Sequence, residues 1–266
     1  MVLTKVPILA ALACAASSLV WAQAQHTGAS HPNLNGIWQA INEANWDLEG
    51  HGARPSPVIA MGALGAAPGG LGVVDGGEIP YLPAALAQRK ENFAKRMELD
   101  PEVKCYLPGI PRATYMPYPF QIVQSDKTVF IGYEYANATR TIFMEKQGEA
   151  PVDSWMGQSV GHWEGNTLVV EVTGLNDLSW FDRAGNFHSD ALHVIERYTP
   201  NGSNFINPTS LNYEATIEDA KTYSRPWKIS MPLYRRLDKN MQLLEFKCVE
   251  FVEELLYGKF RQKPAN

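Results

Sequence analysis

The chain has 266 residues, 45% of them hydrophobic and 19% charged, and its 23 Lys and Arg residues against 28 Asp and Glu residues give a formal net charge of −5. The hydrophobic content excludes a chain that is disordered throughout. The acidic balance, without any run of Lys or Arg, excludes the electrostatic pattern of a nucleic-acid-binding protein. Aromatic residues, Gly and Pro are frequent, which favours short strands and turns over long helices.

Residues 1–24 have the pattern of a secretory signal peptide. Lys5 supplies the positive charge, residues 6–20 are apolar, and Ala22 and Ala24 form a small-x-small cleavage site. No later apolar run approaches the roughly 20 residues that a membrane span needs. We therefore expect a periplasmic or secreted protein without a membrane span, a retained N-terminal anchor being the alternative.

Export would leave two cysteines in the mature chain, Cys105 and Cys248. In an oxidising compartment the pair is expected to form a disulfide, with two buried thiols as the alternative. The loop-closure model gives a bond across about 140 residues an upper stabilisation on the order of 5 kcal/mol. Two cysteines are too few for a structural zinc site.

Residues 25–99 are expected to form an N-terminal segment. It contains a first strand at 36–41, a loop rich in Gly, Ala and Pro at 50–77, and a helix at 83–99 that begins at Pro83. Leu86, Phe93 and Met97 would share the apolar face of that helix. A Pro-rich coil then leads to Pro119, at the start of a β-barrel domain that covers residues 100–266.

The barrel domain is predicted from alternating apolar residues and turn signals. Further strands are expected at residues 120–124, 128–135, 140–144, 158–163, 167–173, 191–199, 211–218, 227–231 and 243–251. Most connections between them are short. The fold class is therefore mainly β, an antiparallel meander closed or nearly closed into a barrel, with one N-terminal helix.

Two of these strands place an acidic residue in an otherwise apolar row, namely Glu196 and Glu250. A buried carboxylate must find a cation or a hydrogen-bond donor, or its pKa rises. Structural ion pairing is the first interpretation, and a role facing a ligand is the alternative. The available cations are Arg140, Arg197, Arg225 and Arg235.

The long connection at residues 174–190 combines ionisable groups with aromatic residues, unlike a plain surface loop. If it lies at the mouth of the barrel, His188 could act as a proton shuttle, with Asp182 or Asp190 as its orienting carboxylate. Arg183 could hold an anionic or carbonyl oxygen. The alternative is a hairpin turn with a local ion pair, in which His188 is an ordinary loop residue.

Aromatic residues near these groups are candidates for ligand binding. Rings held in place by Pro residues, together with one cation, make a rigid apolar rim that suits a small aromatic or carbonyl-bearing molecule. The same residues could instead be plugs that fill the ends of the barrel. The candidates are Arg112, Tyr115, Trp180, Phe181 and Trp227.

Two other patterns carry less weight. Residues 157–161 match the nucleophile motif of α/β-hydrolases around Ser159, but the chain continues as a strand, so the sharp turn into a helix is missing. His188 and His193 are five residues apart and would point to opposite faces of a strand. We therefore predict neither a metal site nor a cofactor.

The first strand carries a resemblance. Gly36 and Trp38, just before a predicted meander, resemble the G-x-W motif of lipocalin-like (calycin) barrels, in which the Trp closes one end and a late Arg packs over it. Here that residue would be Arg235 or Arg225. The run at residues 180–190 also resembles a widespread group of secreted bacterial proteins, a likeness that implies no activity.

Together these features predict an exported β-barrel that encloses a small, largely apolar or aromatic molecule, with cofactor-free acid–base catalysis of the hydratase, lyase or isomerase type. A non-catalytic periplasmic binding or envelope protein is the main alternative, and a metal-dependent enzyme is the second. The oligomeric state is not predicted.

Overall fold

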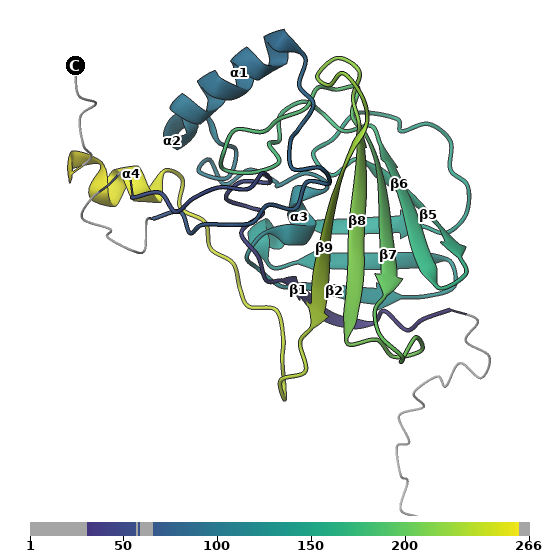
Figure 1. Cartoon of the computed structure of the whole chain (residues 1–266). Coiled ribbons are helices and arrows are strands. Elements are labelled where there is room, and N and C mark those ends of the chain that lie inside the picture. The colour runs from purple at the N-terminus through teal and green to yellow at the C-terminus, as the bar shows by residue number, and fades with distance from the viewer. Residues whose placement is uncertain (1–30, 57, 59–65, 261–266) are drawn as a thin grey trace, which may run out of the picture. The chain divides into compact units, whose positions relative to one another are not determined.

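Nine β-strands form a closed barrel in which each strand pairs with its neighbours in the sequence and β9 pairs back to β1 (Figure 1). The computed structural model describes residues 31–56, 58 and 66–260, so the expected signal peptide at residues 1–24 lies outside the described residues. The strands are β1 (Gly36–Ala40), β2 (Phe120–Gln124), β3 (Thr128–Tyr133), β4 (Thr139–Phe143), β5 (Gln158–Glu164), β6 (Thr167–Thr173), β7 (His193–Pro200), β8 (Ser210–Glu218) and β9 (Trp227–Arg235). The mainly β closed barrel expected from the sequence is confirmed.

One pair of strands departs from the expected antiparallel order. Strands β4 and β5 run parallel, with Ile142 opposite Ser159, because residues 144–157 return the chain to the end at which β4 began. The other neighbouring pairs are antiparallel, so the long connections 41–119, 174–192 and 219–226 gather at one end of the barrel. The connection at residues 174–192, which carries Asp182 and His188, therefore lies at the same end of the barrel as the N-terminal segment.

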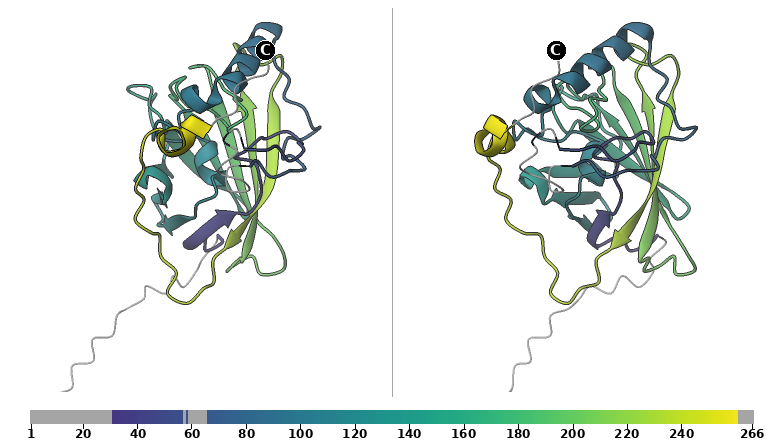
Figure 2. Two further views of the ribbon diagram at one scale, coloured as in Figure 1. Left: turned by 90° about the vertical axis from the view of Figure 1, so that its left-hand side faces the viewer. Right: turned by 60° about the vertical axis from the view of Figure 1, so that its left-hand side comes forward.

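The strand predicted at residues 243–251 is wrong, because these residues form no strand. Pairing between β1 and β9 already closes the barrel, with Ala40 opposite Leu233, and leaves no free edge for another strand. The chain beyond β9 instead runs along the outside of the barrel toward helix α4 (Val252–Tyr257), as Figure 2 shows.

The helical segment at residues 83–99 is divided in two. Helix α1 (Pro83–Ala94) begins at Pro83 as expected, and α2 (Arg96–Leu99) follows after a break at Lys95. The predicted apolar face is wrong at Leu86, which is 40% exposed. The face of α1 that packs inward instead carries Ala85 and Asn92, its two buried residues.

Within the described residues, no helix has the length and apolar character that a membrane span requires.

Trp38 lies under Arg235 where β9 ends. The guanidinium carbon of Arg235 is 4.8 Å from the centre of the Trp38 ring, and the two residues are paired across β1 and β9. Arg235 Nη2 also donates to the Asn33 carbonyl at 2.6 Å. The structure therefore selects Arg235, and not Arg225, as the residue that packs over the tryptophan.

The inner face of the barrel is buried. Inward-facing residues on five of its strands, Phe120, Ile131, Val170, Tyr213 and Ile229, are at most 1% exposed. Glu196 also faces inward and pairs with Arg140, which confirms ion pairing as the fate of that carboxylate.

Replacing Arg235 with Ala should destabilise the protein by about 1–2 kcal/mol, because the variant loses the stacking on Trp38 and a hydrogen bond to Asn33. Urea unfolding measures the change. Arg225→Ala is the matched control, since Arg225 is exposed and, among the described residues, its side chain bonds to the carbonyl of its neighbour Pro226 alone. Equal effects of the two substitutions would contradict the stacking role of Arg235.

Candidate functional site

The histidine predicted as a proton shuttle is buried and bonded on both sides. His188 is 1% exposed, its Nε2 lies 2.8 Å from Ser179 Oγ, and its Nδ1 lies 2.9 Å from the Ser189 carbonyl oxygen. Burial lowers the pKa of His188. The expected hydrogen bond to Asp182 or Asp190 is therefore not formed, because both ring nitrogens are occupied by other partners.

Asp182 organises its own loop and does not contact His188. Its carboxylate accepts hydrogen bonds from the backbone N–H groups of Leu48, Ala184 and Asn186, and from the Asn186 side chain. Burial, with Asp47 nearby, raises the pKa of Asp182 to about 7, against these hydrogen bonds. The carboxylate thus ties the loop to Leu48 of the N-terminal segment.

The other two predicted catalytic residues point elsewhere. Asp190 pairs with Lys221 at 2.6 Å on the surface. Arg183 makes two bonds to Glu102, from Nε at 2.7 Å and from Nη2 at 2.6 Å, and lies over the Trp46 ring. The structure does not gather the four residues into one site, and their catalytic role stays a prediction.

The five residues predicted to bind a ligand are almost completely covered. Trp180 is 8% exposed and Phe181, Tyr115, Arg112 and Trp227 are 1–3% exposed. Phe181 meets Trp227 edge-on, and its carbonyl accepts a hydrogen bond from the Tyr115 hydroxyl. These contacts fit the alternative interpretation, in which the residues plug an end of the barrel. Ligand binding by these residues stays a prediction.

Arg112 and Arg183 share a carboxylate that the sequence reasoning missed. Glu102 accepts from Arg112 Nη2 at 2.7 Å as well as from Arg183, and Arg112 also pairs with Asp100 at 3.0 Å. Burial would raise the pKa of Glu102, but the two guanidinium groups, Arg183 above all, lower it to about 2. Arg112 lies 10 residues from Glu102 in the sequence, whereas Arg183 lies 81 residues away, so only the pair with Arg112 left a local signal.

A groove opens beside this network, between residues 97–103 and the C-terminal residues 246–254. Its volume is about 260 Å³, and Arg183 and Glu102 line it. Its aromatic wall consists of Tyr118, Tyr135 and Phe246, whose ring centres are 4.9–5.7 Å apart. The groove therefore joins an apolar wall to a fixed cation.

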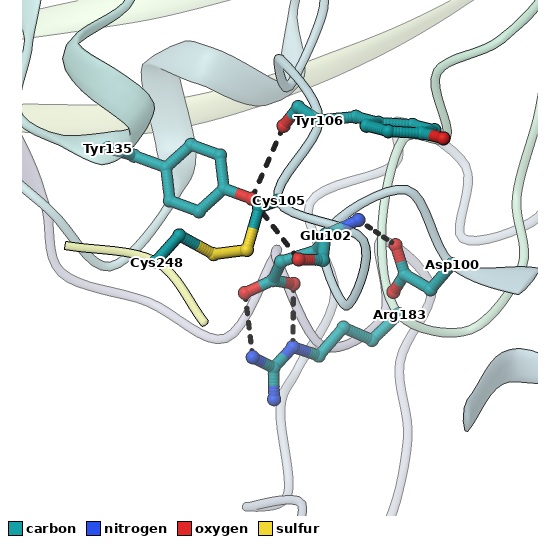
Figure 3. Close-up of a disulfide and its surroundings, with 7 residues drawn as sticks. All are labelled: Asp100, Glu102, Cys105, Tyr106, Tyr135, Arg183 and Cys248. Atoms are coloured by element: carbon teal, nitrogen blue, oxygen red, sulfur yellow. Dashed lines mark hydrogen bonds and ion pairs between the residues drawn. A yellow bond between two sulfur atoms is a disulfide. The ribbon is translucent and has the colours of Figure 1, made fainter. Parts of the chain in front are cut away.

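The disulfide between Cys105 and Cys248 borders the groove, which confirms the expected pairing. Figure 3 shows the bond beside the Glu102–Arg183 pair and the Tyr135 ring, with one Arg183 nitrogen turned away from Glu102. Phe251 adds a second tether, because its N–H donates to the Val103 carbonyl at 2.8 Å. The C-terminal wall is thus attached to residues 103–105.

Charges in the groove almost cancel. Arg183 and Lys247 face Glu102, Glu253 and Glu254 among its lining residues. With three acids against two bases, the groove gives no large preference to an anion. An uncharged aromatic molecule with an oxygen acceptor fits both the rings and the Arg183 nitrogen.

Comparison with known proteins assigns neither a family nor a function, because no family model, curated protein or solved structure matches the chain.

Within the described residues, no group of three or more His, Cys, Asp or Glu side chains is placed to hold a metal ion. His193, the second histidine weighed as a ligand, pairs with Glu218 at 3.0 Å.

Replacing His188 with Ala should destabilise the protein by about 2–4 kcal/mol, because the change leaves a cavity and removes the partner of the buried Ser179 hydroxyl. Urea unfolding at pH 7.5 measures the loss. The exposed Asp190 gives a matched control, and Asp190→Ala should leave the unfolding midpoint unchanged.

The pH dependence provides a second readout of the same substitution. Because burial lowers the pKa of folded His188, the unfolded state binds a proton first as the pH falls below about 6.5, and stability decreases there. His188→Ala should lack this part of the loss. A wild-type and a variant curve of equal slope between pH 7.5 and 5.5 would contradict the buried, neutral histidine.

Removing the disulfide with Cys105→Ser and Cys248→Ser should lower the free energy of unfolding by about 2–5 kcal/mol. Amide hydrogen exchange should accelerate in residues 246–254, because the wall of the groove loses its covalent tether, while exchange in the barrel strands stays slow. Dithiothreitol should reproduce the effect in the wild type and add nothing in the variant. Unchanged exchange in residues 246–254 would show that the wall holds without the bond.

Proposed function

We propose that the protein is an exported β-barrel that binds a small, uncharged aromatic molecule in the groove between residues 97–103 and 246–254. The observation that carries this proposal is the combination of three contacting rings with one fixed guanidinium at a groove of about 260 Å³. Ligand pockets combine a mainly apolar wall with few placed polar groups and begin at about 300 Å³. The groove suits a molecule of roughly one ring.

Arg183 is the polar anchor in this proposal. Its Nε and Nη2 are held by Glu102, while Nη1 bonds to no acceptor among the described residues, and the side chain is 29% exposed. Glu102 fixes the guanidinium so that Nη1 can donate to a carbonyl or hydroxyl oxygen without first losing side-chain freedom. The Trp46 ring packs against the same guanidinium, 4.4 Å from its central carbon.

Binding without catalysis is the function that this geometry favours. Acid–base chemistry needs a group that can exchange a proton beside the ligand, and His188 is enclosed by Ser179 and Ser189. Glu102 has a pKa lowered to about 2, so it stays ionised and cannot act as a general acid near neutral pH. The groove residues therefore hold a ligand more readily than they transform it.

Two observations support the proposed export of the protein and its proposed relationship to lipocalin-like barrels. Disulfides persist in oxidising compartments, so the Cys105–Cys248 bond supports an exported protein. The closed barrel, with Arg235 over Trp38 in a G-x-W motif, supports a lipocalin-like relationship. The ligand site proposed here lies outside the barrel, whereas that resemblance would place a ligand within it.

Acetophenone, benzoate and benzylamine test the proposal, because they share a ring and differ in charge. Acetophenone should bind most tightly, and Phe246→Ala should weaken it about tenfold by removing one of the three rings. Ligand-observed NMR titration measures the affinities of the wild type and the variant.

Phe130→Ala is the matched control, since the Phe130 ring is 41% exposed on the outside of β3 and should not affect binding. Arg183→Lys should weaken acetophenone but preserve the groove, because Lys keeps the charge and loses the planar donor. Failure of all three probes to bind at millimolar concentration, or equal losses for Phe246→Ala and Phe130→Ala, would reject the groove as the site.

A further inference from the structure

A second, smaller cavity adjoins the groove. Its volume is about 60 Å³, and its lining residues come from the N-terminal segment, helix α2 and helix α4. Met97, Val103, Arg183 and Glu253 line both spaces. The groove alone is smaller than the roughly 300 Å³ at which ligand pockets begin, whereas the two volumes together pass that size. A molecule that is held at Arg183 can therefore reach into both spaces.

The smaller cavity has apolar residues on its walls. Trp46, Ala67, Met97 and Val103 line it, and each of them is only half-buried. Apolar surface that remains in contact with water favours the binding of an apolar group, because binding removes both surfaces from water. The smaller cavity therefore suits a short hydrocarbon chain.

The charges around the smaller cavity do not select an ion. The charged lining residues are Arg54, Arg96, Arg183, Asp100 and Glu253. Arg54 pairs with Asp47 at 3.4 Å, and Asp100 pairs with Arg112 at 3.0 Å. An ionised group that entered the cavity would lose its hydration and would compete with these pairs, whereas an uncharged group avoids that cost.

We propose that the ligand carries a short, uncharged aliphatic tail that occupies the smaller cavity while its ring occupies the groove. This inference rests on the proposed function, because Arg183 holds the oxygen that lies between the two parts. A cavity of about 150 Å³ takes benzene, so a cavity of about 60 Å³ has room for two or three carbon atoms. The ligand class is an aryl ketone, or a related carbonyl compound, with a short alkyl chain.

Alkyl phenyl ketones of increasing length test the tail by ligand-observed NMR titration. From acetophenone to propiophenone and butyrophenone, the affinity should increase about fourfold for each added methylene. Valerophenone should add nothing once the cavity is full. If acetophenone binds and the longer chains add nothing, the tail is overturned and the groove remains. An increase that continues to valerophenone and hexanophenone would place the chain elsewhere and also overturn the tail.

Ala67→Leu fills the smaller cavity and leaves the groove unchanged, since Ala67 lines the smaller cavity and not the groove. The variant should bind acetophenone as the wild type does and should lose the gain with chain length. Ala87→Leu is the matched control, because Ala87 is exposed on α1 and lines neither space. If Ala67→Leu and Ala87→Leu show the same gain with chain length, the chain does not enter the smaller cavity.

A charged tail is tested with 3-benzoylpropionate, in which a carboxylate replaces the terminal methyl group of butyrophenone. The keto acid should bind about tenfold more weakly than butyrophenone, because its carboxylate gives up hydration without gaining an unpaired cation. Equal or tighter binding of the keto acid would show that the cavity recognises an anion, and it would overturn the uncharged tail.

Intermolecular NOEs locate the two parts of bound butyrophenone. Its ring protons should contact Phe246, which lines the groove, and its terminal methyl group should contact Trp46, which lines the smaller cavity. NOEs to Phe246 without any to Trp46 would reject the tail alone. If none of the ketones binds at millimolar concentration, the groove and the tail fail together, so the two failures are distinguishable.

Discussion

Pairing between the first and last strands is the constraint on which the rest of the structure depends. Once β9 bonds to β1, with Arg235 opposite Trp38, neither strand has an unpaired edge. The residues that follow β9 cannot extend the sheet, although Leu244 and Phe246 alternate with polar residues as a strand would. They are left to run along the barrel exterior, where they form a wall of the groove.

The groove is assembled from parts that are distant in sequence, and electrostatics holds those parts together. Glu102 binds Arg112 and Arg183, so one carboxylate connects the Pro-rich coil to the loop before β7. Taking charges out of water is costly, and a shared acid with hydrogen bonds to both guanidinium groups offsets that cost. Removing Glu102 would leave the buried Arg112 with Asp100 alone and would release the partly exposed Arg183, whereas removing either arginine would leave Glu102 with the other one.

The sequence predicts the barrel well because alternation reports which side of a strand is buried. Strands β2 and β6 match their predicted bounds, and Glu196 in an apolar row correctly indicated an ion pair, although the sequence left four arginines as possible partners and the structure shows Arg140. The candidate site was harder to predict. The order of residues in the sequence places His188 and Asp182 in one loop, but it does not show in which direction each side chain points. Ser179 and the Leu48 amide, their actual partners, become neighbours only through the fold.

The parallel pair β4 and β5 has a consequence for the parity of the barrel. Strand directions can alternate completely around a closed ring only if the number of strands is even, and here the number is nine. One parallel contact is what allows an odd ring to close. Residues 144–157 must therefore span the barrel, and trimming them to a tight turn would reverse β5 and every strand after it.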